Sequence, residues 1–152
     1  MSLLKTLKNM LPGYGETSTL NKYFQDAYQL EYKNLELLKL LIPTIKYAFI
    51  ADILTEIEKD QIQNCKQIEI EMASNQIEKP ALLSRNEDDS SNLYQTRYKL
   101  MNQLLENTKS LSSLYLHISH ADTIAKSEHA LKLYHEKEKH LLLLQDVVIR
   151  LN

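Results

Sequence analysis

Apolar residues recur every three or four positions along most of the chain, which is the spacing of one buried face on an α-helix. This pattern predicts four long helices, over residues 18–42, 45–73, 92–118 and 120–151. A short amphipathic helix is predicted over residues 2–11, and Pro12 with Gly13 ends it. We expect this short helix to pack across one end of the others, although such a helix can also bind a membrane surface or a partner.

The long helices are predicted to form two hairpins joined by a long connection. Pro43 interrupts the first pattern because proline lacks an amide donor and clashes with the preceding helical turn. Residues 42–47 are therefore interpreted as a turn, with one long kinked helix as the alternative. Residues 74–91 contain Pro80 and little periodicity, which indicates the long connection. The chain is thus predicted to be a single all-α domain, an antiparallel four-helix bundle.

The last predicted helix carries the only dense cluster of histidine and glutamate in the chain. His140 falls near the middle of its apolar face, and Glu136 lies one turn earlier, within reach of the imidazole. Imidazole and carboxylate groups on one inward helical face are typical of a metal site in a helical bundle. The alternative, which this helix by itself favours, is a histidine at the edge of the core that Glu136 holds, beside a solvated polar turn at residues 136–139.

Polar residues also interrupt the apolar faces of the first two long helices. Glu31 is the one charged residue in the stripe of the first helix. In the second helix, Gln61 is the polar member of the stripe, and Glu58 lies beside it three residues earlier. The stripe of the third helix includes Tyr115 but no carboxylate. These residues are the further candidates for an interior site.

Composition narrows the classes of function. The chain has 152 residues, which suits one domain, and its two glycines and three prolines fit long helices with few turns. A net charge of −2 gives no case for nucleic-acid binding. Cys65 is the only cysteine, which excludes an internal disulfide and a paired-cysteine zinc site. No apolar run approaches the roughly 20 residues of a membrane span, and no signal peptide is recognisable, so a cytoplasmic location is expected.

Three segments resemble ferritin-like bundles, most closely the YciF-like branch of stress proteins: MSLLKTL at the start, DAYQLEYKNLELLKLLIP at 26–43 and EKEKHLLLLQDV at 136–147. In that superfamily two helices each supply a glutamate and two each supply Glu-x-x-His, around a di-iron or di-manganese centre. The resemblance implies that Glu31, Glu58, Gln61, Glu136 and His140 are the metal-site residues. The motif is altered, because Gln61 stands where a histidine is expected, the Glu136–His140 spacing is four, and the third helix lacks the glutamate.

These departures favour a ferritin-like bundle with a degraded or absent di-metal site, acting as a non-catalytic stress-related or partner-binding module. No cofactor is expected in that case, and a homodimer formed through an exposed apolar face would be ordinary for such a bundle. One alternative is an iron- or manganese-binding protein that reacts with oxygen or peroxide. Another is a small helical adaptor or immunity-type protein.

Overall fold

A computed structural model describes residues 14–82, 93–120 and 124–151 of the chain. Within these ranges the protein is helical and contains no strand, so the all-α prediction is confirmed. The long helices are α2 (Tyr14–Leu41), α3 (Ala48–Ser74), α4 (Leu93–Ser119) and α5 (Ile124–Leu151). The short helix predicted over residues 2–11 lies outside the described residues.

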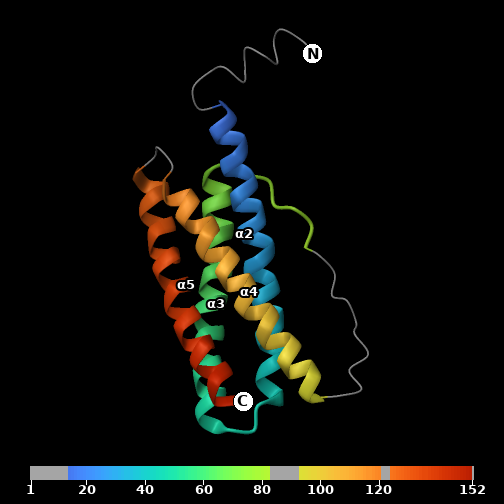
Figure 1. The fold of residues 1–152 in the computed structure, drawn as a ribbon. Coiled ribbons are helices and arrows are strands. Elements are labelled where there is room, and N and C mark those ends of the chain that lie inside the picture. Colours follow the sequence, from blue (N-terminus) through green and yellow to red (C-terminus); the bar gives the residue numbers. More distant parts are fainter. Residues whose placement is uncertain (1–13, 83–92, 121–123, 152) are drawn as a thin grey trace.

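The four helices form a bundle in which each helix has two neighbours (Figure 1). Helix α2 packs antiparallel to α3, and α4 packs antiparallel to α5, so the bundle consists of two hairpins. The hairpins meet through contacts of α2 with α4 and of α3 with α5. Because α3 and α4 run in the same direction, the chain between them has to span the length of the bundle.

A true turn separates α2 from α3, which decides between the two interpretations of Pro43. The α-helix ends at Leu41, a 3₁₀ turn containing Pro43 follows at Ile42–Thr44, and Ile45 is extended. The Arg97 guanidinium of α4 donates to the backbone carbonyl of Thr44 across 2.6 Å. This contact ties the tip of the first hairpin to the start of the second.

The far end of α3 is closed by a Schellman motif, in which two amides beyond the helix bond back to its last carbonyls. Gln76 has a φ of 56°, in the left-handed region that such a cap requires. The Ile77 amide donates to the Met72 carbonyl at 2.8 Å, and the Gln76 amide donates to the Ala73 carbonyl at 3.2 Å. Ile77 is buried against the core, so the connection starts by packing onto the bundle.

The interior consists of two apolar clusters, one toward each end of the bundle. The first is lined by Phe24, Ala27, Tyr28, Ile68, Met72, Ile77, Leu111, Tyr115, Ile118, Ala130 and Leu133. The second is lined by Leu37, Leu38, Leu41, Ile50, Leu54, Ile57, Met101, Leu104, Leu144 and Val147. Along each helix the buried residues between these clusters are polar, except Cys65 of α3, and that middle layer contains the candidate site.

Candidate functional site

All four helices contribute buried polar side chains to the middle of the bundle, and we call this set the polar layer. Its members share exposures of 3% or less, and they are Glu31 and Asn34 of α2, Gln61 and Asn64 of α3, Thr108 and Tyr115 of α4, and Lys137 and His140 of α5. On α2, α3 and α5 the two members are three residues apart. That spacing places both side chains on the same inward face.

An ion pair between Lys137 and Glu31 lies at the centre of the polar layer. The Lys137 Nζ atom is 2.6 Å from Glu31 Oε1, and both side chains are fully buried. Lys137 Nζ also donates to Gln61 Oε1 at 3.0 Å. One of the two orientations of the Asn64 side-chain amide gives both its oxygen and its nitrogen a hydrogen-bond partner. In that orientation the Asn64 oxygen accepts from Lys137 Nζ at 3.0 Å. The three N–H donors of the ammonium therefore each have an oxygen partner.

The Glu31 carboxylate is equally well satisfied. Its Oε1 atom accepts a second hydrogen bond from Gln61 Nε2 at 3.0 Å, and its Oε2 atom accepts from the Tyr115 hydroxyl at 3.0 Å. Gln61 Nε2 also donates to the Glu31 backbone carbonyl at 2.7 Å. A charge pair buried this deeply is tolerated only when its remaining hydrogen-bonding capacity is used, and here it is.

Burial and the negative charge of Glu31 together raise the pKa of two neighbouring side chains, Tyr115 and Cys65. Burial raises the pKa of Tyr115 well above its usual value, and the negative charge of Glu31 raises it further. Burial likewise raises the pKa of Cys65 to about 12, again with a contribution from Glu31. Both groups therefore stay protonated at neutral pH, and Cys65 is an unreactive thiol in the folded protein.

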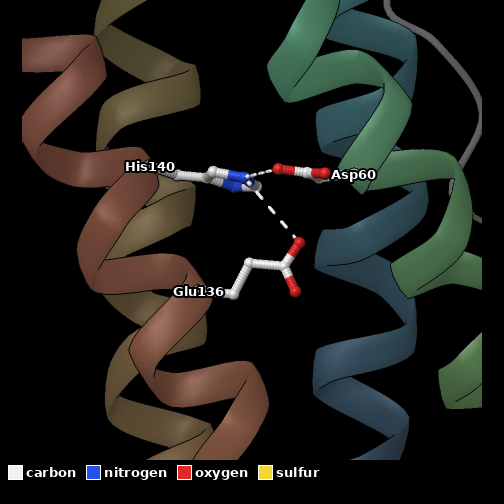
Figure 2. A group of neighbouring side chains, drawn as sticks. All are labelled: Asp60, Glu136 and His140. Carbon is white, nitrogen blue, oxygen red and sulfur yellow. Dashed lines mark hydrogen bonds and ion pairs between the residues drawn. The ribbon is translucent and has the colours of Figure 1, made fainter.

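A second group of side chains, which we call the flanking cluster, lies beside the polar layer and consists of Asp60, Glu136 and His140 (Figure 2). Asp60 projects from α3, and the other two project from α5. His140 Nε2 is 3.0 Å from Asp60 Oδ2 and 3.9 Å from Glu136 Oε1. The His140 side chain is only 2% exposed, whereas those of Asp60 and Glu136 are 38% and 30% exposed, so the cluster opens toward solvent on its carboxylate side.

Electrostatics keep the His140 imidazole neutral. Burial lowers the pKa of His140, and the positive charge of Lys137 lowers it further, although the hydrogen bond with Asp60 acts in the opposite direction. Burial raises the pKa of Glu136, and the charge of Lys137 partly offsets that effect. At neutral pH the flanking cluster thus contains a neutral imidazole, whose Nε2–H donates to the Asp60 carboxylate at 3.0 Å.

The structure divides the five residues that the sequence predicted for a metal site. Glu31 and Gln61 meet in the polar layer, where they contact each other and Lys137. Glu136 and His140 meet in the flanking cluster, as their four-residue spacing predicted. Glu58 is half-buried and belongs to neither group.

Sequence reasoning missed Lys137, Asn64 and Asp60, and it assigned Tyr115 only to the apolar stripe. Lys137 is fully buried, in contrast to the solvated turn considered for residues 136–139, and only its neighbours Glu138 and Lys139 are exposed. A signal was present in the three-residue spacing of Gln61 with Asn64 and of Lys137 with His140. Both pairs fall on inward stripes at the spacing of the Glu-x-x-His motif.

Comparison of the chain with protein-family models, with curated proteins and with solved structures found no match. None of the helices in the described ranges is long and apolar enough to cross a membrane.

Proposed function

We propose that this protein is a non-catalytic, ferritin-like bundle in which a buried lysine–glutamate ion pair occupies the place of a di-metal centre. In ferritin-like proteins two helices each supply a glutamate and two each supply Glu-x-x-His at mid-bundle. Here α2 supplies Glu31, and α4 supplies Tyr115 toward the same point. The motif positions of α3 are filled by Gln61 and Asn64, and those of α5 by Lys137 and His140. The topology of two hairpins joined by one long crossover supports the same assignment.

The observation that carries this proposal is the position of the Lys137 ammonium, 2.6 Å from Glu31 Oε1 and fully buried. It gives the Glu31 carboxylate the positive charge that a metal ion would otherwise give it. A metal bound there would have to displace a paired ammonium or lie beside it. Amides and a phenol are also poor replacements for the carboxylates and imidazole that a pair of cations requires. The side chains of the polar layer do not fit a di-metal centre.

Metal content, measured by plasma mass spectrometry after anaerobic loading with Fe(II) or Mn(II), tests this proposal. The measurement uses the full chain carrying Asp60→Asn and Glu136→Gln, so that the flanking cluster does not contribute. We expect this protein not to bind two equivalents of Fe(II) or Mn(II) per chain. Two equivalents that are lost on Glu31→Gln would overturn the proposal.

A further variant, in the same Asp60→Asn and Glu136→Gln chain, restores the ligands of a di-metal centre and is expected to bind metal. Gln61→Glu, Asn64→His, Tyr115→Glu and Lys137→Glu together place a glutamate on each helix and a Glu-x-x-His motif on α3 and α5. We expect this variant to gain about two equivalents of Fe(II) or Mn(II) per chain, as the superfamily pattern requires. Its circular dichroism spectrum, compared with that of the parent, reports whether it folds.

The outer face of α5 favours a second candidate function, which is self-association. Leu142 and Ile149 are 70% and 73% exposed, and they lie seven residues apart, on one side of the helix. Phe49 is 61% exposed, and its ring lies 5.1 Å from the Arg150 guanidinium near the end of α5. A row of exposed apolar side chains that includes Leu142 and Ile149 can pair with the same row of a second copy across a two-fold axis.

Sedimentation equilibrium tests the homodimer. We expect the full chain to be a dimer, and a variant with Leu142→Glu and Ile149→Glu to be a monomer because the apolar contact is lost. Gln63→Glu, at an exposed position on α3 outside this row, is the matched control and should remain a dimer. A monomeric parent protein at all concentrations would contradict this candidate function.

A further inference from the structure

The flanking cluster has the donor set and spacing of a single-ion site. One imidazole nitrogen and two carboxylate oxygens all lie within 4.8 Å of one another. Ligand atoms about 2.1 Å from a tetrahedral zinc ion lie about 3.4 Å apart. The separations of His140 Nε2 from Asp60 Oδ2 and Glu136 Oε1, 3.0 and 3.9 Å, bracket that value. Small side-chain rotations would bring all three atoms onto one ion, once the imidazole proton has moved from Nε2, where it bonds to Asp60, to Nδ1.

Charge supplies a second, independent observation. In the part of the chain that the structure describes, neither Asp60 nor Glu136 forms an ion pair with a lysine or arginine. Lys137, whose charge acts on Glu136 and His140, is paired with Glu31 instead. Among the described residues neither carboxylate therefore has a lysine or arginine partner of its own, and one divalent cation would neutralise both.

The surroundings also orient the ligands and leave room for solvent. In the same orientation of the Asn64 amide, its nitrogen donates to Glu136 Oε2 at 3.2 Å, which leaves Oε1 free to face His140. Such outer hydrogen bonds hold metal-binding carboxylates in place. Because Asp60 and Glu136 are partly exposed, a hydrated ion can reach the cluster and keep water at its remaining coordination position.

We propose that Asp60, Glu136 and His140 bind one divalent transition-metal ion, with Zn²⁺ held more tightly than Mn²⁺. The imidazole nitrogen favours Zn²⁺ over Mg²⁺ or Ca²⁺, which select oxygen ligands, and Zn²⁺ lies above Mn²⁺ in the general order of affinity. This site shares only His140 with the position of a di-metal centre, because Asp60 and Glu136 belong to neither inward pair and Lys137 occupies the centre. The proposal does not depend on the loss of the di-metal centre.

Titration calorimetry of the full chain with Zn²⁺, in chelator-free buffer, tests the site. We expect one equivalent per chain, and we expect Asp60→Asn and Glu136→Gln each to weaken binding by at least about tenfold, since each removes a charged ligand. Glu56→Gln is the matched control, because Glu56 is an exposed carboxylate on α3 one turn before Asp60. It should bind Zn²⁺ like the parent protein.

Two further measurements keep the test decisive if a variant is less stable. Added Zn²⁺ should raise the thermal unfolding midpoint of the parent protein and leave that of the Asp60→Asn, Glu136→Gln double variant unchanged. Co²⁺ should give a ligand-field absorption spectrum that added Zn²⁺ abolishes. The absence of binding, or binding that the double variant retains in full, would overturn the site. Two ions lost on Glu31→Gln would instead overturn the proposed function.

Discussion

At the scale of single residues, Lys137 is the side chain on which the interior depends. A buried lysine is tolerated here because its charge is opposite that of Glu31 and its three donors meet Glu31, Gln61 and Asn64. We expect Lys137→Met to lower the free energy of unfolding by about 3–5 kcal/mol, because it leaves the Glu31 carboxylate buried without its partner. Urea unfolding followed by circular dichroism measures this change.

Two companion variants separate the ion pair from general effects of substitution. Lys139→Met removes an exposed lysine from the same helix and should change stability by less than about 0.5 kcal/mol. Combining Lys137→Met with Glu31→Gln should cost less than the sum of the two single substitutions, because neither charge is then left unpaired. A Lys137→Met protein as stable as Lys139→Met would contradict the role of the pair.

At the scale of the helices, the periodicity of apolar residues was sufficient to predict the four long helices and the face of each helix that is buried. Glu31, Gln61 and His140 were placed on inward stripes from their spacing, and all three are buried. The contacts between helices could not be predicted, because they depend on how far each helix is displaced along its axis relative to its neighbours. Asp60 meets His140 only through the axial alignment of α3 with α5, which no local pattern encodes. Spacing also places Lys137 on the inward stripe of α5, but its charged neighbours indicated a solvated turn.

The first hairpin depends on a contact from the second at its tip. Arg97 of α4 donates from Nη2 to the Thr44 carbonyl and from Nε to the Thr44 hydroxyl, at 2.6 and 3.4 Å. Because hydrogen bonds from a charged donor contribute about 1.5–3 kcal/mol, we expect Arg97→Met to lower stability by an amount in that range. Thermal unfolding compared with Lys99→Met, an exposed position two residues later, checks this. Equal midpoints for the two variants would show that the contact contributes nothing.

At the scale of the whole molecule, the polar layer fixes the alignment of the helices. The two apolar clusters specify this alignment less sharply, because apolar contacts are non-directional. A shift of one helix along its neighbours by a turn would separate Lys137 from Glu31 and would leave buried charges and amides without partners. The shifted alignments of the helices are therefore less stable than the native one. In this way a buried polar group specifies one structure.

The same layer makes the stability of the molecule sensitive to alkaline pH. Tyr115 and Cys65 have pKa values raised in the folded state above their ordinary values of 10.0 and 9.0. A raised folded-state pKa contributes stability that is complete below the unfolded-state pKa and is lost as pH rises toward the folded-state value. We therefore expect the free energy of unfolding to fall above about pH 9 as Cys65 contributes, and more steeply above about pH 10 as Tyr115 adds to it. The slope should be about 1.4 kcal/mol per pH unit for each group.

Urea unfolding at a series of pH values checks this prediction, and two variants assign the slope to its sources. Cys65→Ala should remove the component that begins near pH 9. Tyr115→Phe should reduce the component that begins near pH 10, to which Tyr32 also contributes because burial raises the pKa of Tyr32 as well. Each variant is less stable at neutral pH. The lysines lose their charges over the same pH range in the parent and in both variants, so only a difference in slope reports on the buried groups. Identical slopes in all three proteins would mean that folding raises the pKa of neither Cys65 nor Tyr115. The closed, charge-paired interior inferred from Glu31 and Lys137 would then be wrong.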